Sequence, residues 1–169
     1  MNFKEQFNQN IKDYYWKNKR NLISQNFYSA SHQFKAIMDD ANGPCEYQLK
    51  GWRKNTMGYR GVGHSSGLYS KLRSKSSINL SVKEYVFDHV VGATLCGKTV
   101  EDKIKETDYK IKYLIDNWLF DNLYLWGTIK VSKIEHKKDN ILRNKNTLSE
   151  KINFEHYKVI SVFDLVSEN

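Results

Sequence analysis

An acidic side chain and an imidazole stand next to each other where a short apolar run ends. The segment KEYVFDHVVG, residues 83–92, has strand character up to Asp88 and His89 and continues into two valines and a glycine. A carboxylate can hold a metal ion, and an imidazole, whose unperturbed pKa is about 6.5, can take a proton from water near neutral pH. The pair can therefore be part of a metal-dependent catalytic site, or it can be a solvated strand end with no chemical role. The surrounding elements must distinguish these two interpretations.

A second short strand is expected further along the chain, followed directly by a helix. The β-branched run GTIKV at residues 127–131 predicts the strand. Ser132 and Glu135 have the S-x-x-E spacing of a capping box, in which each residue binds a backbone N–H of the other. We therefore predict a helix that starts at Ser132 and runs to about Lys145.

A histidine lies in the first turn of this expected helix. If the two strands pair antiparallel and the helix packs across them, His136 can approach Asp88 and His89, and the helical segment 93–126 becomes an excursion between the strands. Adjacent side chains point to opposite faces of an ideal strand, so the approach requires a bend, which Gly92 permits. We expect the heavy atoms of the three side chains to lie within about 8 Å of one another.

The first forty residues predict two helices. Apolar residues recur at three-to-four spacing over residues 3–23, and a second helix is predicted over 24–40 with Ser24 as its N-cap. The sequence ANGPC at 41–45 ends it.

The middle of the chain gives weaker patterns. Residues 51–80 are rich in glycine, serine and basic residues, which predicts a loop or an irregular hairpin, and residues 78–87 alternate as a strand does. Past Gly92 the pattern becomes helical, with a helix start at Thr99, and the apolar segment 109–126 predicts a well-buried helix. The final YKVISVFDLV fits either a strand or a short helix.

The positive charge of the chain is concentrated in its first half. The formal net charge is +8, and residues 1–80 carry thirteen Lys and Arg against five Asp and Glu, whereas residues 81–169 carry fourteen of each. No acidic residue lies between Glu46 and Glu84. Such a stretch favours a polyanionic partner, of which nucleic acid is the obvious one. The residues expected to contact it are Arg53, Lys54, Arg60, Lys71, Arg73, Lys75, Trp52 and Tyr59.

Length and composition are those of a globular protein. The chain has 169 residues, of which 40% are hydrophobic, enough for one domain with a real core. No apolar run approaches the roughly 20 residues that span a bilayer, and the N-terminus lacks a secretory h-region. We therefore expect a soluble, cytoplasmic protein with no membrane partner. Cys45 and Cys96 have no zinc-finger spacing and are expected to be free thiols.

A strand ending in Asp-His, a second strand and a helix bearing His or Asn together resemble the ββα-metal arrangement of HNH nucleases. The closer resemblance is to small HNH-type proteins of tailed phages, in which an Asp-His strand, a helical stretch of some forty residues and a strand leading into a K-x-E-N or K-x-E-H helix start follow in order. Here these read FDHVV and TIKVSKIEHKKD, and the resemblance covers residues 83–143. The family's middle Asn has no clear counterpart, although Asn117 and Asn122 are candidates.

The resemblance implies metal-dependent cleavage of DNA phosphodiester bonds. Asp88 and His136 would hold a divalent ion, Mg²⁺ or Mn²⁺, and His89 would be the general base. It further implies a phage-encoded endonuclease, of the homing type or directed at host or competitor DNA, that acts in the cytoplasm of a bacterial host, and it allows a homodimer.

The resemblance also gives an expectation for the fold. The chain would be α+β and mostly helical, with a small ββα-metal unit made of a two-stranded hairpin plus a helix, and with an N-terminal helical and basic region. Residues 1–80 would form the DNA-binding region, and residues 81–169 the nuclease-like region with a helical insertion at 93–126.

Two other functions fit parts of the sequence. Glu135, His136 and Lys137 match the E-x-K half of a PD-(D/E)xK nuclease site, but that site needs a strand, whereas the capping box predicts a helix. A nucleic-acid-binding protein without catalysis, or a phage structural protein that reuses the fold, would use the basic first half equally well.

Overall fold

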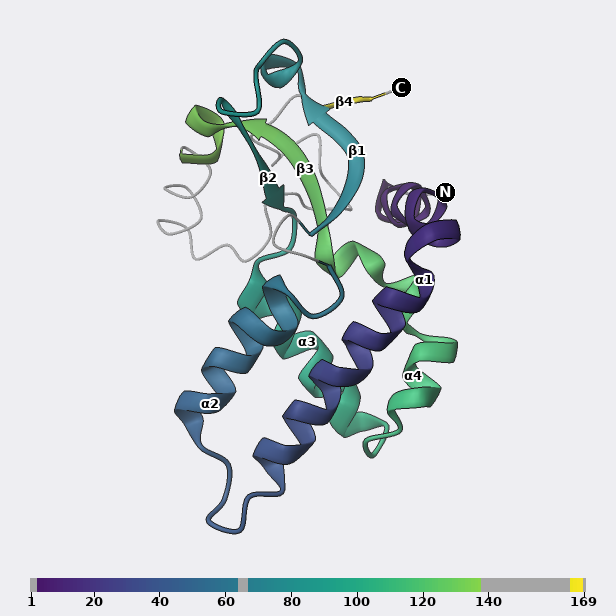
Figure 1. Cartoon of the computed structure of the whole chain (residues 1–169), viewed down its shortest axis with the longest axis vertical. Helices are drawn as coiled ribbons and strands as arrows, with labels where there is room; N and C mark the ends of the chain where they lie inside the picture. The colour runs from purple at the N-terminus through teal and green to yellow at the C-terminus, as the bar shows by residue number, and fades with distance from the viewer. Residues whose placement is uncertain (1–2, 64–66, 138–164, 169) are drawn as a thin grey trace.

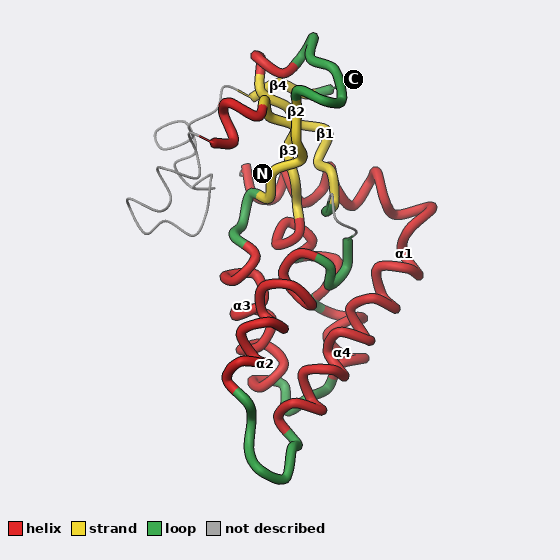
Figure 2. The backbone as a smooth tube through the Cα atoms, turned by 60° about the vertical axis from the view of Figure 1, so that its left-hand side comes forward, coloured by secondary structure: helices red, strands yellow, loops and turns green. Residues whose placement is uncertain are grey.

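The chain folds into a mixed α+β structure that is mostly helical, with a small sheet at one end (Figure 1). The computed structural model describes residues 3–63, 67–137 and 165–168. The helices are α1 (Phe3–Met38), α2 (Glu46–Gly51), η1 (Trp52–Tyr59), η2 (Lys75–Ser77), α3 (Ala93–Glu106), α4 (Ile111–Asn117), η3 (Leu119–Asp121) and η4 (Leu123–Trp126). The strands are β1 (Leu68–Ser74), β2 (Tyr85–His89), β3 (Gly127–Ser132) and β4 (Leu165–Ser167). Figure 2 shows the longer helices gathered on one side of the four strands.

The first forty residues form one helix where the sequence predicts two. Ser24, expected as an N-cap, lies inside α1, and its hydroxyl donates a hydrogen bond of 3.0 Å to the carbonyl of Arg20 one turn earlier. A buried apolar stripe, which includes Phe7 and Phe27, runs along the helix and holds both halves against the same core. The chain turns after Met38 as expected, and Gly43 there has a φ of 86°.

The prediction of a loop from residue 51 is wrong for its first part. Residues 46–59 are helical, as α2 followed by the π-helical η1. Gly58 in this region and Gly97 in α3 allow the two helices to pack closely. A Cβ on Gly58 would lie 2.2 Å from the carbonyl oxygen of Ala93, and a Cβ on Gly97 would lie 2.0 Å from that of Arg53. Helices η1 and α3 therefore cross with their backbones almost in contact.

Within the described residues, four strands form one sheet in the order β2-β3-β1-β4. β2 and β3 are antiparallel, β1 and β3 are parallel, and β4 is antiparallel to β1. The expected two-stranded hairpin is thus corrected to a larger sheet, because the supposed loop supplies β1 and the C-terminal segment supplies β4. The strand expected over 78–87 begins only at Tyr85, since residues before it form turns.

The excursion between β2 and β3 is helical, as predicted, but is divided differently. α3 begins directly after Gly92, and the hydroxyl of Thr99, the expected start, donates to the Leu95 carbonyl within the helix at 2.8 Å. The segment expected as one helix over 109–126 is α4 followed by two 3₁₀ turns. These turns place Leu119 and Trp126 in the core and deliver the chain into β3.

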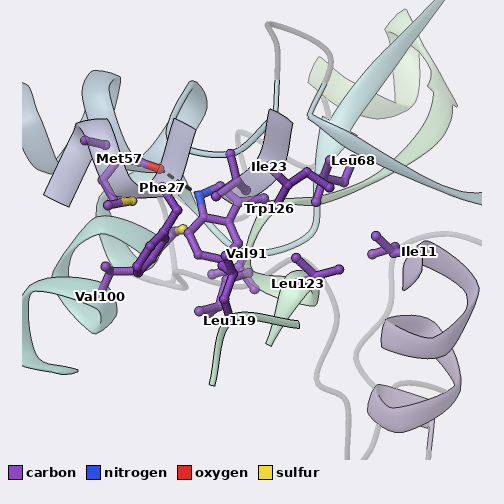
Figure 3. Close-up of a cluster of buried hydrophobic side chains, with 14 of the residues drawn as sticks. Ile11, Ile23, Phe27, Met57, Leu68, Val91, Val100, Leu119, Leu123 and Trp126 are labelled. Carbon is purple, nitrogen blue, oxygen red and sulfur yellow. Dashed lines mark hydrogen bonds between the residues drawn. The ribbon is translucent and has the colours of Figure 1, made fainter. Parts of the chain in front are cut away.

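The core joins the two halves of the sequence. Trp126 is fully buried among residues such as Ile23 and Phe27 of α1, and its indole N–H donates a 2.7 Å hydrogen bond to the carbonyl of Met57 (Figure 3). The regions 1–80 and 81–169 therefore share one hydrophobic cluster, and the boundary at residue 80 stays a prediction. No helix in the described part of the chain is long and apolar enough to cross a membrane.

Candidate functional site

The antiparallel pair β2–β3 brings Asp88 and His136 together. Asp88 lies opposite Ile129 near the end of β2, and β3 runs directly into a helical turn at residues 133–137. This turn places His136 Nδ1 3.1 Å from Asp88 Oδ1. The aspartate side chain is only 2% exposed, whereas the histidine is 36% exposed. The expected proximity is confirmed for these two side chains.

The capping box predicted from the sequence is present and fixes the turn that carries His136. The backbone N–H of Ser132 donates to Glu135 Oε1 at 2.9 Å, and the N–H of Glu135 donates to Ser132 Oγ at 3.1 Å. Ser74 of β1 donates a further 2.6 Å hydrogen bond to the same carboxylate oxygen. Glu135 thereby ties the turn to two strands.

The electrostatics of Glu135 are those of an anchoring carboxylate. Burial acts to raise its pKa, but hydrogen bonds from Ser74, Ser76 and Ser132 outweigh burial and hold the pKa below its usual value. Because residues 133–137 are helical, the E-x-K assignment, which requires a strand, does not fit this segment.

His89 is the last residue of β2 and is held by two neighbours that the sequence did not indicate. It pairs with Thr128 of β3 and is 8% exposed. The ring of Tyr59 meets the imidazole edge to face, with centroids 5.2 Å apart. Gly67, with a φ of 67°, lies so close that a Cβ there would be 2.9 Å from His89 Nε2. Asp88 thus contacts His136, and His89 beside it contacts Tyr59 and Gly67.

Three of the residues expected to contact DNA are engaged inside the fold. Trp52 is 2% exposed and donates its indole N–H to the Ala30 carbonyl at 2.8 Å, so the structure places it in the core rather than on the surface. Arg53 binds the fully buried Glu101 through two hydrogen bonds of 2.7 and 2.8 Å. Arg73 is mostly buried and donates to the side chain and backbone carbonyl of Ser77. Their polar groups stabilise helices and sheet instead.

The other expected DNA contacts are accessible. Lys54, Arg60, Lys71 and Lys75 are exposed, and Tyr59 is 38% exposed. The ammonium group of Lys71 lies over the ring of Tyr14, 4.5 Å from its centroid, so this cation packs against a side chain of α1.

The candidates for an orienting asparagine are used locally. Asn117 donates its amide to the Tyr113 carbonyl at 3.0 Å, and Asn122 donates to the Trp118 carbonyl at 2.7 Å. These bonds close turns in their own helical segments. Neither interaction involves the imidazole of His89.

The donors at Asp88 and His136 suit a divalent ion with several open positions. Within the described residues, no group of three or more His, Cys, Asp or Glu side chains could hold a metal, so this is a two-donor arrangement. Two ligands about 2.1 Å from an octahedral ion, at a right angle, are about 3 Å apart. The observed separation of 3.1 Å between Asp88 Oδ1 and His136 Nδ1 equals that spacing, and it is also the ordinary length of a hydrogen bond between a carboxylate and an imidazole.

Comparison with known proteins gives no family for this chain. No protein-family model matches it, no curated protein matches it, and no solved structure matches it. The function must therefore be inferred from the contacts and chemistry of the site.

Proposed function

We propose that the protein is a metal-dependent DNA endonuclease of the HNH type. In this proposal β2, β3 and the turn at residues 133–137 form the ββα-metal unit, Asp88 and His136 bind Mg²⁺ or Mn²⁺, and His89 is the general base. The observation that carries the proposal is the 3.1 Å contact between Asp88 Oδ1 and His136 Nδ1, two side chains far apart in sequence.

The chemistry of phosphodiester hydrolysis matches these groups. A divalent ion bound there would polarise the scissile phosphate and neutralise charge on the leaving oxygen. Magnesium commonly takes few protein ligands and leaves its other positions to water and phosphate oxygens. The neutral imidazole of His89 would accept the proton of the attacking water, and Tyr59 and Gly67 would restrict the ring to one orientation.

Exposed basic residues in the first half of the chain support DNA as the substrate. Lys54, Arg60 and Lys75 are exposed, and no acidic residue lies between Glu46 and Glu84 to repel phosphate. The sequence resemblance to phage HNH proteins supports the remaining parts of the proposal: a phage-encoded enzyme of the homing type, or one directed at host or competitor DNA, acting in a bacterial cytoplasm.

The test is nicking of supercoiled plasmid by the purified protein with Mg²⁺ or Mn²⁺, and with EDTA as the metal-free reaction. We expect nicking only with metal. His89→Ala should abolish nicking while leaving DNA affinity nearly unchanged, because a general base acts in the transition state. His32→Ala, an exposed histidine on α1, is the matched control and should nick normally.

The outcomes separate the proposal from its alternatives. Binding of plasmid without nicking under any metal condition would favour a non-catalytic nucleic-acid-binding protein. Full activity of the His89→Ala variant would remove His89 from the mechanism.

A further inference from the structure

A polar hollow lies between α1 and the η1 region, separate from the Asp88–His136 pair. Its volume is about 600 Å³, within the roughly 300–1,000 Å³ typical of sites for small ligands. The polar side chains that line it are Asn26, Ser29, Gln33, Asn55, Thr56 and Arg60.

The lining has the chemistry of a nucleotide site. The amides of Gln33 and Asn55 each offer donors and an acceptor, which is the combination that binds the edge of a base. Arg60 supplies a planar guanidinium, which binds phosphate oxygens in pairs. Among the described residues that line the hollow none is acidic, so a phosphate meets no opposing charge there.

Two residues that line the hollow, Arg60 and Gly63, are close neighbours of residues that lie beside His89. Arg60 follows Tyr59, whose ring packs against the imidazole. Gly63 lines the hollow and lies against Gly67, with 2.9 Å between its added Cβ position and the Gly67 Cα. Gly67 in turn approaches His89 Nε2. A DNA strand that presents a phosphate to His89 would therefore extend toward the hollow.

We propose that this hollow binds one nucleotide of the DNA strand that flanks the scissile phosphate. The phosphate of that nucleotide binds Arg60, and its base binds the side-chain amides of Gln33 and Asn55. The inference rests on the proposed nuclease function only in placing this nucleotide beside the bond that is cut. Binding of the nucleotide requires neither metal nor cleavage.

The experiment measures binding of fluorescently labelled single-stranded and duplex oligonucleotides by anisotropy, in EDTA so that no strand is cut. The double variant Gln33→Ala, Asn55→Ala should bind at least about fivefold more weakly, the effect of losing one good base contact. Arg60→Ala should weaken binding and reduce its salt dependence by about one phosphate. All three side chains are exposed, so these changes leave the fold intact.

Matched controls separate the hollow from the general surface. Gln25→Ala removes an exposed amide on α1 outside the hollow and should bind as the wild type does. In a series of oligonucleotides, each with one abasic site at a different position, one position should weaken binding by the wild type. The same abasic site should not weaken binding by the double variant Gln33→Ala, Asn55→Ala.

The outcomes are distinct for the two proposals. Wild-type affinity of the Gln33, Asn55 double variant, or equal losses in that variant and in Gln25→Ala, would overturn the nucleotide site. An Asp88→Asn variant that still nicks plasmid would overturn the proposed metal site while leaving the binding result for the hollow intact.

Discussion

At the scale of single residues, the contact between Asp88 and His136 carries the most information. A carboxylate that is 2% exposed has lost most of its hydration, and it needs hydrogen bonds or a cation in compensation. The imidazole of His136 supplies one contact, and a divalent ion between the two groups would supply a stronger one. A metal site and a simple strand-to-helix hydrogen bond predict different responses to added metal.

The first prediction is that Mn²⁺ stabilises the folded protein. A ligand that binds only the folded state adds about 2.7 kcal/mol to the free energy of unfolding at a hundred times its Kd. Thermal unfolding with increasing Mn²⁺ should show this for the wild type. Asp88→Asn, which retains the shape of the side chain, should lose it. Asp102→Asn, a change at an exposed carboxylate, should respond to Mn²⁺ as the wild type does. If neither Mn²⁺ nor Mg²⁺ changes the thermal unfolding of the wild type, a metal at Asp88 and His136 is excluded.

A second buried carboxylate, Glu101, has a structural role and a definite pH dependence. It is fully buried and binds Arg53, Lys98 and Lys105. Burial acts to raise its pKa, but the hydrogen bonds from Arg53 and Lys98 and the nearby charges outweigh burial and lower the pKa to about 2. Because the folded pKa lies below the usual value near 4.3, the stabilisation is complete above about pH 4.3 and is lost as pH falls toward 2.

The second prediction follows from this pH window. Glu101→Gln should lower the free energy of unfolding by roughly 3 kcal/mol at pH 7, because Arg53 is left mostly buried without its carboxylate. The difference from the wild type should shrink at pH 3, as measured by denaturant titration at both values. Asp102→Asn, which loses only an exposed ion pair, should change stability by less than about 1 kcal/mol. An equal loss for Glu101→Gln at pH 7 and pH 3 would show that packing and not charge is responsible.

At the scale of elements, the crossing of η1 and α3 sets the position of the segment that leads to Tyr59. Gly58 and Gly97 allow the two backbones to approach, and Arg53 on η1 reaches Glu101 on α3 beside them. Gly58 is also one of the glycines that made residues 51–80 resemble a loop in the sequence. Glycine is a weak helix former in isolation, and only the position of the partner helix reveals why it is there.

The third prediction compares two glycines in helices. Gly97→Ala should destabilise the protein by about 1–3 kcal/mol, because the new methyl group would meet the backbone of Arg53. Gly51→Ala has nothing within 4 Å of the added Cβ and should stabilise α2 by up to about 1 kcal/mol. Denaturant unfolding of both variants checks the pair, and an unchanged Gly97→Ala would contradict the close crossing.

Local signals made some elements predictable and left others hidden. The strand at residues 127–131 and the Ser132–Glu135 capping box were readable because their cues lie within a few residues of each other. β1 was not, since its partners β3 and β4 are distant in sequence and only pairing with them makes it a strand. α1 was divided in the prediction because Ser24 resembles a cap, whereas buried residues in both halves of the helix pack into one core and override that local preference.

The candidate site was predictable to a similar extent. Asp88 and His136 could be placed together because Asp88 lies near the end of one strand and His136 lies in the helical turn directly after the other. The packing of Tyr59 and Gly67 beside His89 could not, since both residues are more than twenty positions away from His89 in the sequence. Burial of Trp52 was equally hidden, because an aromatic residue among basic ones fits both a core helix and a DNA contact.

At the scale of the whole molecule, the uneven charge remains the main argument for a nucleic-acid partner. The structure reduces the number of available cations, since Arg53 and Arg73 are engaged with Glu101, Ser77 and Glu168. The exposed cations expected to contact DNA are Lys54, Arg60, Lys71 and Lys75. If DNA binds to a local surface, only the lysines of that surface affect the binding. If the net positive charge alone attracts DNA, exposed lysines elsewhere affect the binding equally.

The last prediction measures that difference through salt. Each phosphate neutralised on duplex DNA releases condensed counterions and contributes about −0.9 to the slope of log affinity against log salt, so four contacts give a slope of about −3.6. Replacing Lys71 and Lys75 by Ala should reduce the slope by up to about 1.8 and weaken binding to all sequences alike, because phosphate contacts carry no sequence information. Replacing Lys110 and Lys112, exposed residues in the neutral half, removes the same charge and should leave the slope unchanged. Equal changes in the two double variants would mean that net charge, and not the surface formed by the first half of the chain, attracts DNA.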